Sequence, residues 1–252
     1  MRAVFPALIC VGLSACGPAT APAFFTDESL NGNIFSGPAA TLVATGSPGD
    51  QGYRSSVSIE FPAAGQAVFT FDGFTGPTLF WDAGEEAYLD PAGDYALIFS
   101  SEAGTPDIVT FVVLGNLNTP TPFTQLHVNG NLTAAQNVPS SGGALYSGAI
   151  GAFDGAGNLM EGAVDLDLNF NLDMVSGSFY LDGTQVGRAD FTVTPVSLVN
   201  GQFQTTVISA DLGVYDSFFD GALFGDNADQ LGGEFYVNSS NGSMIGSYTA
   251  SQ

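Results

Sequence analysis

Lysine is absent from this sequence, and the 252 residues hold only three basic side chains, all of them arginine, against 25 acidic ones. The absence of lysine excludes Schiff-base catalysis and phosphate binding by a P-loop. The formal net charge of −22 at pH 7 predicts repulsion from nucleic acids and from anionic lipid headgroups. A basic protein partner or a bound cation is compatible with this charge, but we favour the simpler interpretation that the acidic surface is solvated in a saline medium.

Cysteine and histidine are almost absent as well. The two cysteines are Cys10 and Cys16, and the single histidine is His127. One histidine excludes a multi-histidine metal or heme site; a single axial heme ligand is still allowed, but a histidine among valine and leucine is more typical of a structural role. No Gly-x-Ser-x-Gly elbow occurs. We therefore predict no catalytic residue, no metal site, no cofactor and no enzymatic activity.

The N-terminus has the pattern of a bacterial lipoprotein export signal. One arginine precedes an apolar run far shorter than the ~20 residues of a membrane-spanning helix. The run ends in Leu13-Ser14-Ala15-Cys16, which resembles a lipobox: small residues fit the signal peptidase, and Cys16 supplies the thiol that takes the diacylglycerol. The alternative is an ordinary cleaved signal followed by a chance cysteine.

We therefore predict a lipoprotein signal peptide at residues 1–15, lipid attachment at Cys16 and a flexible tether at 16–23. Several acyl chains on Cys16 would anchor the protein stably. Gly17 is not the aspartate that typically retains such lipoproteins at the inner membrane, which favours the outer membrane. Because Cys10 lies in the signal peptide, the mature chain would have no cysteine left for a disulfide or a thiolate nucleophile.

The body of the chain is predicted to be all-β. It has 33 glycines, 21 phenylalanines and 8 tyrosines, a composition that favours short strands and turns. A run of turn formers at 137–143 separates a β-rich domain at 24–138 from a second domain at 139–252. The strands predicted in the first domain are 56–61, 67–71, 78–81, 94–100, 108–115 and 124–128.

The second domain is predicted to be an eight-stranded antiparallel up-and-down barrel. Its clearest strand alternates strictly from Val164 to Leu172, and in a soluble barrel the apolar residues of this strand (Val164, Leu166, Leu168, Phe170 and Leu172) should point inward. Asn241-Gly242 predicts a tight hairpin. The eight predicted strands are 144–153, 163–171, 175–181, 188–194, 202–209, 217–224, 233–238 and 243–250.

One segment begins like a calcium-binding loop. Asp165-x-Asp167-x-Asn169 matches the first ligands of an EF-hand. The position that needs glycine is Phe170, and the twelfth position is Ser176 in place of glutamate. We therefore interpret this segment as a β-strand and not as a calcium-binding loop.

The C-terminus carries a family resemblance. The run Gly225-x-x-Ala228-Asp229-x-x-Gly232-Gly233-x-Phe235, followed by Gly246-Ser247-Tyr248-Thr249-Ala250, resembles the signature of the transferrin-binding-protein-B-like β-barrel lipoproteins. The resemblance implies the barrel fold, with a domain similar to the family's "handle" preceding it. It also implies a single-lobed member, because the full protein has two lobes and this chain has room for one.

These observations predict an outer-membrane, surface-exposed lipoprotein that acts as a binding module for a protein or for a small iron-related ligand. The alternative is a structural envelope lipoprotein with no specific ligand. Large aromatic side chains are enriched at interface centres, so Phe74, Phe80 and Trp81 are the candidate ligand-binding residues, although aromatic residues serve a β core equally well. The predicted partners are thus the membrane, through the lipid anchor, and an unidentified protein or small molecule, and no nucleic acid.

Overall fold

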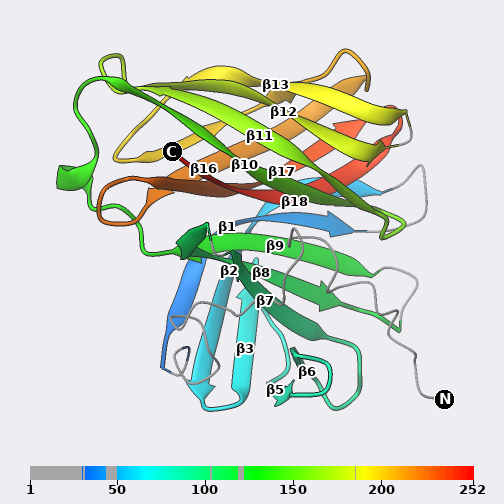
Figure 1. Ribbon diagram of the computed structural model, residues 1–252. Coiled ribbons are helices and arrows are strands. Elements are labelled where there is room, and N and C mark those ends of the chain that lie inside the picture. Colours follow the sequence, from blue (N-terminus) through cyan, green and yellow to red (C-terminus); the bar gives the residue numbers. More distant parts are fainter. Residues whose placement is uncertain (1–29, 31, 44–49, 103, 119–121, 185) are drawn as a thin grey trace.

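The computed structural model describes residues 30, 32–43, 50–102, 104–118, 122–184 and 186–252. The predicted signal peptide, Cys16 and the tether lie outside these residues. Two antiparallel sheets account for nearly all of the described chain, and Figure 1 shows one above the other. Within the described residues, no helix is both long and apolar enough to cross a membrane.

The first sheet is a ring in which each strand except β4 pairs with the next strand of the ring along the chain. β1 pairs with β9, and β3 pairs with β5, so that eight of the nine strands close into a circle while β4 forms a short hairpin on β3. We call this sheet the N-terminal ring. Its strands are β1 (Ile34–Val43), β2 (Gln51–Ala63), β3 (Gln66–Phe71), β4 (Phe74–Thr75), β5 (Leu79–Asp82), β6 (Ala87–Leu89), β7 (Ala96–Glu102), β8 (Thr105–Gly115) and β9 (Phe123–Gly130).

A short connection leads to the second sheet, the C-terminal barrel, and includes one 3₁₀ turn, η1 (Ala135–Asn137). The barrel has eight strand positions, one of which is shared by β14 and β15, and it closes where β18 pairs with β10. Its strands are β10 (Gly143–Asp154), β11 (Leu159–Asn169), β12 (Met174–Thr184), β13 (Gly187–Ser197), β14 (Gln202–Thr205), β15 (Val207–Ile208), β16 (Val214–Phe224), β17 (Gln230–Ser239) and β18 (Gly242–Ser251).

The structure confirms the predicted all-β fold and the eight-stranded up-and-down barrel. On β11, Val164, Leu166 and Leu168 are fully buried in the barrel core, as the period-2 pattern predicted. Leu172 was also predicted to point inward, and this prediction is wrong, because its side chain is 68% exposed. The strand ends at Asn169, whose side chain accepts the backbone N–H of Leu172 (3.2 Å) and so turns the chain before the alternation reaches that residue.

The C-terminal hairpin is present, but shifted by one residue from the prediction. Ser239 pairs with Gly242, so the loop consists of Ser240 and Asn241. Gly242 has a φ of 121°, a value that side-chain-bearing residues rarely adopt. Glycine is therefore required at the first position of the last strand.

Aromatic rings fill the centre of the barrel. Phe219 on β16 stacks on Tyr248 with 4.8 Å between ring centroids, and on Phe179 at 5.5 Å. Phe179 in turn stacks on Phe191 at 4.5 Å. All four side chains are at most 3% exposed. The interior of the barrel is thus occupied by side chains, as expected for a closed sheet of eight strands.

Candidate functional site

The structure separates the three aromatic residues that the sequence singled out. Phe74 and Phe80 are 44% and 46% exposed, whereas Trp81 packs inside the N-terminal ring against Tyr88, with 5.1 Å between ring centroids. Phe74 pairs with Phe71 at one end of β3, while Phe80 pairs with the first residue of the same strand. A spacing of five residues corresponds to roughly 16 Å along a strand. The three residues therefore do not form one surface.

The outward face of the barrel strands β16, β17 and β18 is covered by the N-terminal ring, in particular by β1, β2, β8 and β9 (Figure 1). We call this contact the seam. Its apolar part includes Leu42 and Leu126 against Ile245, and Ile108 and Val128 against Phe224. Because one face of β17 lines the barrel core and the other faces the ring, this strand is buried along almost its whole length.

Side chains of the barrel replace missing strand partners on the ring. The Asn238 amide accepts the N–H of Gly52 (2.8 Å) and donates to its carbonyl oxygen (2.7 Å). The Gln230 amide accepts the N–H of Asp107 (2.9 Å) and donates to the Asp107 carboxylate (2.6 Å). These pairs join segments more than 100 residues apart in the chain and fix the register of one sheet against the other.

Two carboxyl groups are buried in the seam. Glu234 on β17 accepts the N–H of Val128 on β9 through Oε2 (3.1 Å), and Asp220 on β16 accepts the N–H of Glu234 (3.1 Å). Both side chains are nearly inaccessible to solvent. Burial raises the pKa of Glu234 and of Asp220 well above their ordinary values, and the proximity of Glu234 raises the pKa of Asp220 further. Each group is thereby biased toward its neutral form.

His127 lies beside this pair. Its Nδ1 donates to the carbonyl oxygen of Pro38 (2.7 Å), which leaves Nε2 to accept the amide of Asn129 (3.0 Å). Burial lowers the pKa of His127 from 6.5 to about 4. The distance of 3.9 Å between Nδ1 and Glu234 Oε1 is therefore a contact between two groups that burial keeps neutral rather than a strong ion pair. The imidazole is enclosed and hydrogen-bonded on both sides, which gives His127 a structural position.

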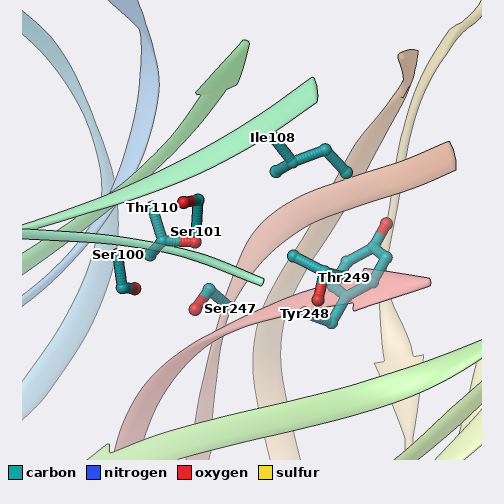
Figure 2. Close-up of a pocket in the computed structure, with 7 residues that line it drawn as sticks. All are labelled: Ser100, Ser101, Ile108, Thr110, Ser247, Tyr248 and Thr249. Carbon is teal, nitrogen blue, oxygen red and sulfur yellow. The ribbon is translucent and has the colours of Figure 1, made fainter. Parts of the chain in front are cut away.

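The seam leaves little free volume. One cavity in the seam has a volume of about 10 Å³. Figure 2 shows its lining residues, with Ser100, Ser101 and Thr110 from the ring on one side and Ser247 and Thr249 of β18 on the other. A volume of ~10–15 Å³ corresponds to one water molecule. The cavity therefore cannot hold a ligand.

A much larger hollow of about 670 Å³ lies on the outer face of β12 and β13. Tyr180 and Arg188 form its floor, with the guanidinium carbon 3.7 Å from the centroid of the tyrosine ring. Arg188 also donates to Asp190 (3.0 Å), while Asp165 and Asp211 contribute to the wall. A volume of this size falls in the range of ~300–1,000 Å³ that binding clefts occupy. Within the described residues, no cluster of three or more histidine, cysteine or acidic residues is suited to a metal ion.

The sequence analysis missed both the seam acids and this hollow. Glu234 is the single acidic residue of β17, and Asp220 directly follows Phe218 and Phe219 in β16; an acidic residue in such an apolar surrounding is a signal for a buried polar contact. The hollow has no comparable signal, because Tyr180, Arg188 and Asp211 read as ordinary outward-facing residues. Only the closure of the barrel brings them together.

A known protein family matches the second half of the chain. Residues 138–252 match the family model of the C-lobe and N-lobe beta barrels of Tf-binding protein B. Among curated proteins, none matches the sequence.

Solved structures of transferrin-binding proteins B share the fold. One of them, a mutant of the vaccine antigen from Haemophilus parasuis, has a TM-score of 0.51 and 16% identity, and the match covers 85% of this chain and 45% of that one. Intact Ap-TbpB follows with a TM-score of 0.47, 16% identity and coverages of 88% and 60%. The isotype 1 protein of serogroup B Neisseria meningitidis has a TM-score of 0.40, 14% identity and coverages of 78% and 52%. The chain thus spans between 45% and 60% of the length of these proteins.

Proposed function

Because residues 138–252 match the family model of the transferrin-binding protein B β-barrels, we propose that the protein is a non-enzymatic binding lipoprotein. It would be held in the outer membrane by a lipid on Cys16, exposed at the cell surface, and would bind a protein partner. The two β domains, at residues 24–138 and 139–252, would form the binding body.

The filled interior of the barrel favours a protein partner over a small iron-related ligand. The aromatic rings around Phe219 occupy the space that a small ligand would need. The outer surface, in contrast, is strongly acidic, and its basic groups among the described residues are only Arg54 and Arg188. A basic protein surface is the complement of this charge distribution.

Phe74 and Phe80 are the aromatic residues that such a partner could reach on the N-terminal ring. Trp81 would act indirectly, since its ring packs on Tyr88 and Phe99 and holds β5 in place. Protein interfaces place aromatic side chains at their centres, and the half-exposed rings fit this use.

We expect Cys16→Ser to abolish membrane attachment while leaving the body folded, because the thiol would be the point of acylation and the strands of both sheets are formed by residues 34–251. The measurement is the partition of the protein between the membrane and soluble fractions of the cell. Thermal unfolding of the purified variant serves as the folding control. If Cys16→Ser stayed in the membrane fraction, the lipid anchor would be refuted.

Surface exposure is tested by treating intact cells with a protease and blotting for the protein. We expect loss of the signal, with a periplasmic protein retained as the control for cell integrity. Protection of the protein would place it inside the envelope and reject the cell-surface part of the proposal.

The partner surface is tested by capture from the native medium or host fluid with immobilised wild-type protein. We expect Phe80→Ala to weaken binding of the captured partner about thirtyfold, since truncating a central aromatic residue typically costs ~2 kcal/mol or more. Leu145→Ala, on the exposed face of β10, is the matched control. Equal capture by the wild type and Phe80→Ala would remove Phe80 from the interface, and no capture by the wild type would favour a structural envelope protein.

A further inference from the structure

The wall of the C-terminal barrel is incomplete along one strand. β13 pairs with β12 along its length, but on its other side it pairs with β15 only at Thr192–Ile208 and Val193–Val207. The first residues of β13, from 187 to 191, therefore present a strand edge without a neighbouring strand. Such an edge is a template for the addition of an extended segment.

A side chain occupies the position that a partner strand would take. The N–H of Asp190 points away from β12 and donates to the Asp211 carboxylate (3.0 Å). This carboxylate stands in for the carbonyl oxygen of a neighbouring strand. Asp211 is exposed, so it can move aside when another acceptor arrives.

The hollow described above borders this same edge. Ile208, which lines the hollow, is 62% exposed, and Tyr180 lines the hollow as well. An extended segment along β13 would bring every second side chain over this face. The surface thus offers backbone hydrogen bonds together with an apolar contact.

The charge around the edge determines what kind of segment fits. Asp165, Asp190 and Asp211 line the hollow. The hydrogen bond to Asp190 raises the pKa of the Arg188 guanidinium group, and the negative charge of Asp182 is also close enough to raise it. The single cation, Arg188, is already paired with Asp190. The uncompensated charge is negative and favours basic side chains.

We propose that the β13 edge, with the hollow beside it, binds an extended basic segment of another protein by strand addition. Every second side chain of the segment would face the hollow, where a basic one would pair with the displaced Asp211 and an apolar one would pack on Ile208. The site lies on the barrel, whereas Phe74 and Phe80 lie on the N-terminal ring, so this inference does not depend on the partner proposed above.

The probe is a synthetic peptide about ten residues long, to match a strand, in which every second residue is serine and the residues between are lysine and valine in turn, so that lysine and valine lie on the same face. We expect it to bind the purified protein in calorimetry at low salt, and to slow hydrogen exchange of the backbone amides of β13 around Arg188. The same peptide with glutamate in place of each lysine should not bind. Failure of the basic peptide to bind, or binding without protection of β13, would overturn the proposal.

Two variants locate the site. Asp211→Lys should weaken binding at least about tenfold, because it places a cation against the basic segment and removes the displaceable acceptor. Glu60→Lys, at an exposed position on β2, makes the same charge change on the other sheet and should have little effect. Ile208→Ser should weaken binding without harm to folding, since the side chain it removes is exposed. Equal affinities for Asp211→Lys and Glu60→Lys would show non-specific charge attraction and refute the site.

Discussion

Replacing Phe219 with alanine is expected to lower the free energy of unfolding by about 3–5 kcal/mol, the usual cost of truncating a buried phenylalanine. Phe219 is fully buried and contacts the rings of Phe179, Phe203 and Tyr248. These rings come from strands on different sides of the barrel, so they cannot collapse into the space that the truncation leaves. The loss should be visible in urea or thermal unfolding.

Tyr215→Ala is the matched control for this variant, because Tyr215 lies on the same strand and is 70% exposed. It should change the free energy of unfolding by less than about 0.5 kcal/mol, as is usual for surface substitutions. A loss of under about 1 kcal/mol for Phe219→Ala would mean that the barrel core is not packed around this ring.

Acidification from pH 6.5 to pH 4 is expected to remove about 3 kcal/mol of stability through His127 alone. Burial lowers the pKa of His127 from 6.5 to about 4, so the unfolded chain takes up a proton in this interval and the folded chain does not. The contribution is fully present above pH 6.5 and is lost as the pH falls toward 4. Each unit of pKa difference corresponds to about 1.4 kcal/mol.

The seam acids act in the opposite direction. Because burial raises the pKa of Glu234 and of Asp220, the folded state is penalised at pH values above their ordinary range, and this penalty is relieved as the pH falls. The total pH dependence of the wild type is therefore a sum of opposed effects. A variant without the histidine is therefore needed to separate its contribution to stability from that of the two acids.

His127→Gln provides this isolation, since glutamine does not titrate. The free energy of unfolding should be measured for both proteins by urea titration at several pH values between 6.5 and 4. We expect the wild type to lose about 3 kcal/mol relative to His127→Gln over this interval. A constant difference between the two proteins would show that the imidazole is not held neutral in the seam.

Glu234→Gln tests the opposite pH dependence, the one that arises from the raised pKa of Glu234. Glutamine can still accept the N–H of Val128 but carries no charge at any pH. Relative to the wild type, the stability of Glu234→Gln should therefore increase as the pH rises, because in the wild type the unfolded chain loses the Glu234 proton at a pH where the folded chain still holds it. Parallel curves for the two proteins would contradict the raised pKa of Glu234.

Much of the fold could be predicted from local pattern. The alternation along β11 and the regular spacing of turn residues were enough to predict an eight-stranded barrel, because side-chain direction in a strand has a period of two. The same pattern failed at Leu172, where the Asn169 side chain ends the strand. Among the candidate binding residues, the sequence could identify large aromatics but could not distinguish Trp81, which packs in the ring, from the half-exposed Phe80.

By itself, the sequence determined most strands of the barrel, which residues fill it, and how little basic charge the protein carries, whereas β1 and β6 of the N-terminal ring were not among the predicted strands. The tertiary structure decided what lies against the outer face of each strand. Period-2 alternation indicates which residues share a face of a strand, but it does not indicate what packs against that face. Glu234 is buried because β9 packs against it, and β9 lies more than 100 residues earlier in the chain. The open edge of β13 likewise results from where β15 stops pairing. Contacts between distant segments set the pKa values and the free edges, and no local pattern encodes them.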